Sequence, residues 1–172
     1  MNVRAATLDD VPELARVHTE SSLVAYEGIA PPDPDGLARR ARNWRNVIEQ
    51  PQYDAFVAED DGLVIGVLSV GASEQEEGAG ELYAIYVHPE HWGRGAGQAL
   101  LDTAHEVLSA SYEEAVLTVL VANPRARRFY ERNDWRLYDV RTELHFGGIP
   151  IEVAKYRTRF TRTGRGAPPR PA

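Results

Sequence analysis

Three closely spaced glycines stand between an apolar segment and a helical pattern in the stretch Glu81–Leu101 (ELYAIYVHPEHWGRGAGQALL). Gly93, Gly95 and Gly97 carry no side chain, so the backbone can approach a ligand closely at this turn. The helix that follows begins with unpaired N–H groups and the positive end of its dipole, which attract anions. Together these features predict a site for a phosphate or pyrophosphate group.

Two common nucleotide motifs do not explain this turn. A P-loop needs a Gly-Lys-Ser/Thr ending, which the stretch does not contain. The dinucleotide fingerprint G-x-G-x-x-G would place its last glycine at Gln98 or at Leu100, depending on the register. A turn that serves only local geometry is the alternative interpretation of this motif taken alone.

A second segment with the residue types of a binding site follows the apolar run Ala115–Val121. Asn123 is favoured as a helix N-cap, and Pro124 is favoured at the first helical position. One face of the predicted helix carries four residues by i, i+3, i+6 and i+7 spacing: Asn123, Ala126, Phe129 and Tyr130. The two segments are close enough in the chain to belong to one domain.

At these two segments the sequence resembles the GNAT superfamily of N-acetyltransferases. Trp92–Gly97 is similar to the family motif Q/R-x-x-G-x-G/A, and Asn123–Tyr130 matches N-x-x-A-x-x-F-Y at every defined position. The spacing between the motifs and the early AYEGIAPP stretch also resemble the family. Two positions depart from the usual pattern, because Trp92 replaces Gln or Arg and Asp134 replaces glycine.

The periodicity of apolar residues predicts elements that agree with this resemblance. Strands are expected at 2–6, 53–59, 63–71, 81–88, 115–121, 135–146 and 149–160, and helices from residue 7, at 35–49, at 95–109 and at 123–132. The order βααβββαβαββ indicates an α/β, mixed α+β fold with helices on both faces of a sheet. The resemblance implies a mostly antiparallel twisted sheet of about seven strands and about four helices, with central parallel strands that splay apart. We expect one domain over 1–160 and a disordered tail over 161–172, which is rich in Arg, Gly and Pro.

The resemblance implies acetyl-CoA as co-substrate and assigns the residues that bind it. The backbone of Ile85, Tyr86 and Val87 would hold the pantetheine arm where the strands diverge. The turn would hold the pyrophosphate with Trp92, Gly93, Arg94, Gly95, Ala96, Gly97 and Gln98. Asn123 would bond the amide region of the cofactor, and Tyr130 would contact the thioester and protonate the departing thiolate.

The base that deprotonates the attacking amine has three candidates. An ammonium of pKa about 10.4 must lose a proton before it can attack a thioester. Glu81 is the first candidate, because strand alternation would put it on one face with Tyr83, Ile85 and Val87. His88, beside the turn, and a water molecule are the alternatives.

Composition restricts the remaining choices. The 172 residues include no cysteine, which excludes disulfides and an acetyl-cysteine intermediate. The net charge of −7 argues against a nucleic-acid partner and mildly favours a cationic substrate. No apolar run reaches membrane length and the N-terminus lacks a signal-peptide pattern, so we expect a cytoplasmic protein. No pair of histidines has metal-ligand spacing, and no metal is expected.

The resemblance implies that the acceptor is a primary amine, of a small molecule or of a protein, and the sequence does not separate these two classes. Tyr26 and Tyr83 are candidates for the acceptor pocket. The alternative function is a non-catalytic acyl-CoA-binding sensor or interaction module. A homodimer is compatible with the resemblance.

Overall fold

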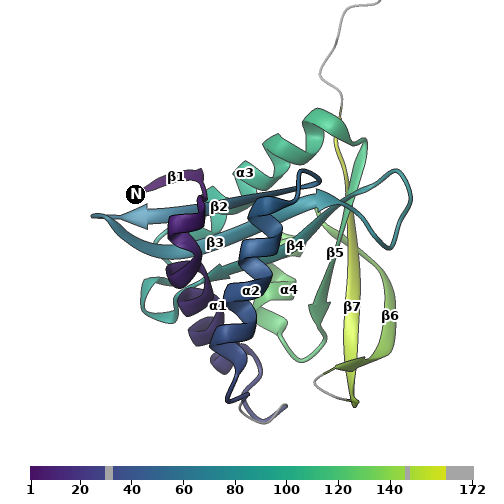
Figure 1. Ribbon diagram of the computed structural model, residues 1–172. Helices are drawn as coiled ribbons and strands as arrows, with labels where there is room; N and C mark the ends of the chain where they lie inside the picture. Colours follow the sequence, from purple (N-terminus) through teal and green to yellow (C-terminus); the bar gives the residue numbers. More distant parts are fainter. Residues whose placement is uncertain (30–32, 146–147, 162–172) are drawn as a thin grey trace, which may run out of the picture.

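The computed structural model describes residues 1–29, 33–145 and 148–161, and within them seven strands form one sheet with helices on both faces (Figure 1). The strands are β1 (Asn2–Ala5), β2 (Tyr53–Asp60), β3 (Leu63–Ala72), β4 (Gly80–Val87), β5 (Glu114–Leu120), β6 (Arg136–His145) and β7 (Ile149–Arg159). The helices are α1 (Val11–Ala25), α2 (Gly36–Glu49), α3 (Ala96–Ser111) and α4 (Pro124–Glu131), with short 3-10 turns at Leu8–Asp10 and Pro89–His91. This order confirms the predicted pattern βααβββαβαββ.

The strands lie in the order β1-β2-β3-β4-β5-β7-β6, and all neighbours pair antiparallel except β4 and β5, which are parallel. This confirms the mostly antiparallel mixed sheet that the family resemblance implies. None of the helices in the described ranges is long and apolar enough to cross a lipid bilayer. The predicted tail, 161–172, lies outside the described residues except for Thr161, as does Gly147 of the last predicted turn.

Two apolar cores hold the helices against the sheet. On one face Leu100 of α3 is buried with Trp135 beside the sheet, and on the other Leu14 of α1 is buried with Trp44 of α2. The buried residues of α3, which include Leu100, Leu101, Ala104 and Leu108, follow i, i+3, i+4 spacing and form its core-facing side. Because each face is filled, a ligand site has to open at an irregularity of the sheet.

A β-bulge is the first such irregularity, and it lies in β4. Ser69 of β3 pairs with Ala84, whereas the next residue, Val70, pairs with Leu82. Tyr83 is therefore an extra residue that has no counterpart on β3. An extra residue inverts the side-chain alternation of the strand beyond it.

The bulge corrects one expectation about β4. Ile85 and Val87 pack on the core under α3, whereas Ala84 and Tyr86 pack on the core under α1 and α2. The prediction that Glu81 shares a face with Ile85 and Val87 is wrong, because simple alternation assumes that no residue is inserted. Strand pattern alone does not reveal such an insertion.

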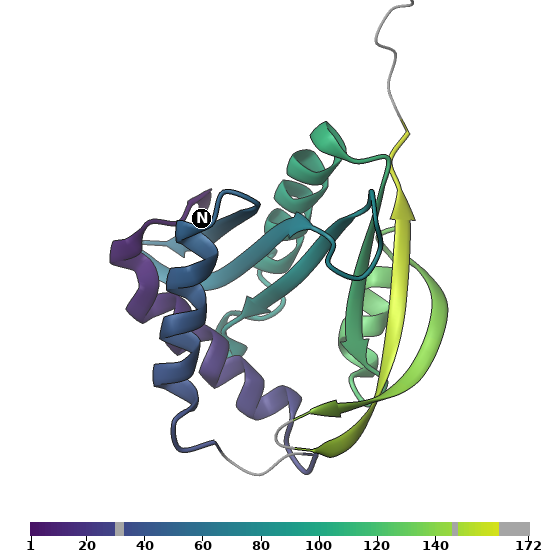
Figure 2. The same cartoon turned by 45° about the vertical axis from the view of Figure 1, so that its right-hand side comes forward.

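The second irregularity is the divergence of β4 from β5. These two strands pair only over Gly80–Leu82 and Ala115–Leu117, and the ladder ends there. Figure 2 shows the strands moving apart toward the C-terminal ends of both. This confirms the splayed central strands that the resemblance implies, and it leaves the β5-facing edge of 83–87 without a strand partner in the described structure.

An ion-pair cluster fixes the entry to α1, which forms one side of this opening. The Asp10 carboxylate accepts hydrogen bonds from the Thr7 backbone N–H at 2.7 Å and from both terminal nitrogens of Arg4 at 2.8 Å. Arg4 also donates to Glu59 of β2 at 2.6 Å. These contacts hold the pKa of Asp10 down at about 2, with the Arg4 hydrogen bonds as the main cause.

We expect Asp10→Asn to lower the free energy of unfolding by about 1–2 kcal/mol at pH 7. The folded pKa of about 2 lies below the reference value of 3.8, so the carboxylate stabilises the fold above that reference. This contribution is lost as the pH falls through the folded pKa. Urea unfolding at pH 7 and at about pH 3 should therefore show the two proteins converging in acid. Asp9→Asn, at an exposed neighbouring carboxylate, is the matched control; an equal loss there would contradict the assignment.

Candidate functional site

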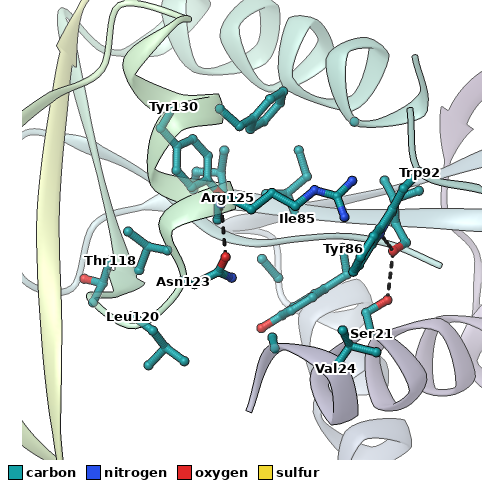
Figure 3. Close-up of a pocket in the computed structure, with 18 of the residues that line it drawn as sticks. Ser21, Val24, Ile85, Tyr86, Trp92, Thr118, Leu120, Asn123, Arg125 and Tyr130 are labelled. Carbon is teal, nitrogen blue, oxygen red and sulfur yellow. Dashed lines mark hydrogen bonds between the residues drawn. The ribbon is translucent and has the colours of Figure 1, made fainter. Parts of the chain in front are cut away.

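A cavity of about 810 Å³ opens where β4 and β5 diverge. Its wall combines the end of α1, the outer half of β4, the glycine turn before α3, the end of β5 and one face of α4 (Figure 3). His145 and Val153 of the last hairpin complete it. The fold thus brings both sequence motifs and the early tyrosine-containing segment to one cavity.

The glycines of the turn line this cavity, and each has its own physical reason. Gly93 and Gly95 have φ angles of +74° and +89°, which residues with a side chain rarely adopt. Gly97 has no such angle, and a Cβ atom built there would come no closer than 3.8 Å to the Phe129 ring. Since the fold does not require glycine at 97, the missing side chain leaves room inside the cavity.

The other predicted residues of the turn divide into two groups. Gln98 lines the cavity, and its side-chain amide donates to Asp102 and Asn133 at 2.9 and 2.8 Å. Arg94 is exposed and Ala96 is buried in the core under α3, and neither is among the described residues that line the cavity. For Arg94 and Ala96, the prediction that remains is a contact between their backbone and a ligand.

The Trp92 ring contacts the guanidinium group of Arg125, which belongs to the second motif. The guanidinium carbon of Arg125 lies 3.5 Å from the ring centroid, and the indole N–H donates to the Val87 carbonyl at 2.7 Å. Arg125 forms no ion pair within the described structure, and burial lowers its pKa. A guanidinium beside a glycine turn, without a carboxylate partner, is suited to bind a phosphate. Figure 3 shows Arg125 extended from α4 toward Trp92.

The outer half of β4 faces the cavity as predicted for Ile85, Tyr86 and Val87. The Val87 carbonyl accepts a hydrogen bond from the Ser21 hydroxyl at 3.1 Å in addition to the bond from Trp92. These two bonds satisfy this carbonyl and tie α1 to the strand end. The remaining backbone groups on the β5-facing edge are the ones available to a ligand.

The α4 motif positions Asn123 and Tyr130. Asn123 accepts a hydrogen bond from the Ala126 N–H at 3.0 Å through its side-chain oxygen, which confirms the predicted N-cap. Tyr130 is buried, lines the cavity, and packs against Phe129 and Trp135. No group in the described ranges hydrogen-bonds its hydroxyl, and burial raises its pKa, so the phenol holds its proton at neutral pH.

Further phenols line the cavity. Tyr26 and Tyr83 both line it, as predicted, and the Tyr83 hydroxyl is held by the Ala72 carbonyl at 2.6 Å. Tyr86 stacks on His18 with ring centroids 4.3 Å apart. Burial is the main cause that lowers the pKa of His18 to about 3, so this imidazole is neutral.

The structure does not bring the two side chains proposed as bases to the wall of the cavity. Glu81 is 3% exposed and accepts hydrogen bonds from Ser73 at 2.7 Å and Gln75 at 3.0 Å. Burial raises the pKa of Glu81. His88 lies 2.9 Å from a Glu20 oxygen. Neither residue is among the described residues that line the cavity.

Several residues that line the cavity were not predicted from the sequence, and one reason applies to all of them. They are Ser21, Val24, His91, Thr118, Leu120, Arg125 and Arg132. Each sits at an undefined position of a motif or outside both motifs, so only the folded chain shows that it faces the cavity. Among the described residues no three His, Asp or Glu side chains come together as a metal site.

Comparison with known proteins agrees with this geometry. Residues 16–135 match the Acetyltransferase (GNAT) family. The N-acetyltransferase YuaI of Bacillus subtilis, described as uncharacterized, is 33% identical over 138 residues, which are 72% of this chain and 74% of that protein. An uncharacterized N-acetyltransferase of Archaeoglobus fulgidus is 31% identical over 145 residues, 79% of this chain and 93% of that protein.

A solved structure extends the comparison to the fold. The PaiA N-acetyltransferase of Thermoplasma acidophilum, in complex with coenzyme A, superposes with a TM-score of 0.72. It is 20% identical, and the match covers 92% of this chain and 98% of that chain. At this identity the likeness concerns the fold alone.

We expect Gly97→Val to weaken acetyl-CoA binding by about tenfold or more, equivalent to roughly 1.4 kcal/mol. The new side chain would occupy cavity space, whereas the contacts of its Cβ are ordinary, so the melting temperature should change little. Isothermal titration with acetyl-CoA measures the effect. Ala38→Val creates the same branched side chain in the exposed first turn of α2 and should leave binding unchanged. Full affinity in Gly97→Val would place the phosphate site elsewhere.

Proposed function

The chain belongs to the acetyltransferase (GNAT) family, and from this premise we propose that it acetylates a primary amine by direct attack on acetyl-CoA in a ternary complex. As a member of the family it is an acetyl-CoA-dependent N-acetyltransferase. The amine and the direct mechanism are the parts that we propose. The observation that carries the proposal is the single cavity that joins the glycine turn, the open edge of β4 and the Tyr130 phenol.

The residues present fit an acyl-CoA. Gly97 leaves space where a Cβ would stand, and Arg125 offers a guanidinium without an ion-pair partner in the described structure. The usual Gln or Arg of the first motif is absent, and Arg125, held on the Trp92 ring, supplies a cation in its place. The β4 edge at 83–87 offers backbone groups to an extended amide chain such as pantetheine. The PaiA neighbour was solved with coenzyme A, which agrees with this assignment.

The donor supplies an activated thioester, and the chain supplies position and hydrogen bonds. Holding amine and thioester together in the cavity removes most of the entropic cost of their encounter. Backbone N–H groups on the β4 edge can stabilise the negative charge that develops on the thioester oxygen. No cysteine is present to form an acetyl-cysteine intermediate, which supports direct passage of the acetyl group to the amine.

Tyr130 is the proposed general acid. Its hydroxyl lines the cavity with its proton available, and it can donate to the sulfur as charge develops there. A raised pKa makes the phenol a weaker acid than the thiol of the leaving group. Its contribution is therefore greatest as a hydrogen bond to the sulfur in the transition state. When its proton passes to the thiolate, the proton released by the attacking amine restores the phenol.

Glu81 is the proposed base, and it would act through water. Burial raises the pKa of this carboxyl, which suits proton acceptance near neutral pH. Its neighbour on the bulge, Tyr83, lines the cavity, so a water beside Tyr83 would connect Glu81 to the amine. Ser73 and Gln75 hold the carboxylate in place for this role.

We expect acetyl-CoA to raise the melting temperature and a panel of primary amines to elicit release of free CoA. Acetyl-CoA at 100 times its dissociation constant should stabilise the fold by about 2.7 kcal/mol. ATP at the same concentration should stabilise much less, because it lacks the pantetheine arm. A thermal melt and a thiol-reagent assay measure these outcomes. Equal stabilisation by ATP would reduce the cavity to a general phosphate site, and binding without turnover would leave only a sensor.

We expect Tyr130→Phe to lower kcat by about 100-fold with little change in acetyl-CoA affinity. The substitution removes one oxygen and keeps the packed ring, so the fold should be preserved. Steady-state kinetics under conditions where chemistry limits the rate measure the effect. Tyr53→Phe removes a hydroxyl that bonds Glu74 outside the cavity and should leave kcat unchanged. An unaltered kcat in Tyr130→Phe would make this tyrosine structural.

A further inference from the structure

Carboxylates are absent from the described wall of the cavity. The chain has 26 Asp and Glu residues, but none of the described residues that line the cavity is one of them. The charged side chains in that lining are Arg125 and Arg132, both on or just after α4. The segments outside the described ranges, 30–32, 146–147 and 162–172, contain no Asp or Glu in the sequence.

Three glutamates on the elements that form the cavity are engaged by other side chains. These contacts are Glu20 with Arg16 and His88, Glu81 with Ser73 and Gln75, and Glu143 with Lys155 and His145. Glu27 follows Tyr26 but is exposed and outside the described lining. An ammonium group in the cavity would therefore find no carboxylate directed toward it.

Apart from the glycine turn, the lining of the cavity consists largely of apolar groups and phenols. Its apolar members include Val24, Ala25, Leu82, Ala84, Leu120 and Val153. Figure 3 shows Val24 and Leu120 on different elements, with the Tyr86 ring projecting into the space between them. An uncharged hydrocarbon or aromatic body can be buried favourably against such a wall.

One boundary of the cavity is a contact across the splayed strands. Tyr26 and Ile29, at the end of α1, pack against Leu120, Ile151 and Val153 of β5 and β7. In Figure 2 the end of α1 lies beside the start of β7. A contact of this kind restricts access to the cavity from this side, which favours a small molecule over a folded protein as acceptor.

We propose that the acceptor is a small primary monoamine with an uncharged, largely apolar body, and that polyamines are poor substrates. The proposal rests on the proposed acetyl transfer and specifies its acceptor. A second ammonium group on the acceptor would lose hydration in the cavity without gaining a carboxylate counter-ion from the described lining. The reacting amine escapes this penalty once its proton has passed through water to Glu81, the proposed base, whereas a second ammonium group has no such base.

The test compares three acceptors by kcat/KM at one pH and ionic strength. They are 2-phenylethylamine, spermidine and a short lysine-containing peptide. We expect 2-phenylethylamine to be preferred over spermidine by about 100-fold, since a mismatched buried charge discriminates more strongly than a methylene group. Equal or better use of spermidine or of the peptide would overturn the proposal and leave acetyl transfer intact. If neither these three acceptors nor any other primary amine causes release of CoA, both the acceptor proposal and the proposed acetyl transfer are overturned.

A pair of variants on α1 tests the missing carboxylate directly. Val24 lines the cavity and is 46% exposed, whereas its neighbour Leu23 is 58% exposed and lies outside the described lining. Val24→Glu should lower kcat/KM for 2-phenylethylamine by about tenfold and raise that for spermidine, because the new carboxylate faces the acceptor. Leu23→Glu adds the same charge outside and should change neither value. Equal effects of the two variants, with melting temperatures unchanged, would overturn the proposal.

Discussion

The end of the β4–β5 ladder is the constraint on which the rest of the structure depends. Paired strands satisfy each other's backbone groups, and the pairing stops at Leu82 and Leu117. Beyond that point each N–H and C=O of β4 that faces the opening needs another partner. At Val87 the protein supplies it through Ser21 and Trp92. The unsupplied groups are what makes the opening a place for an amide-containing ligand.

Features around the opening extend this one irregularity into a site. The bulge at Tyr83 turns Tyr86 toward the α1 side, where Tyr86 lines the cavity. The turn beyond β4 then needs left-handed residues, which Gly93 and Gly95 provide, before α3 can start under the same cavity. On the far side, the Asn123 cap starts α4 so that Tyr130 and Arg125 face the opening together. Each element is ordinary, and their convergence comes from the diverging strands.

Local signals in the sequence were sufficient for most of the fold and for part of the site. Helical spacing predicted the buried face of α3, and the cap chemistry of Asn123 predicted the start of α4, because both depend on neighbours within a few residues. The bulge in β4 was missed because it depends on how β3 pairs with it. The Arg125–Trp92 contact was missed because its partners lie in separate motifs. Contacts between residues far apart in the sequence cannot be predicted from the spacing of residues along the chain.

The net charge of the whole chain and the charges around the cavity lead to different expectations about the substrate. A net charge of −7 makes a cationic substrate the natural expectation, because long-range attraction follows total charge. Specificity, however, is decided within a few ångströms, where burial removes screening by water and each charge must find a partner. Here the acidic side chains lie outside the described lining, in contacts such as Glu81 with Ser73 and Glu20 with His88. A chain can thus be acidic overall and still present an acceptor site that favours an uncharged, apolar body.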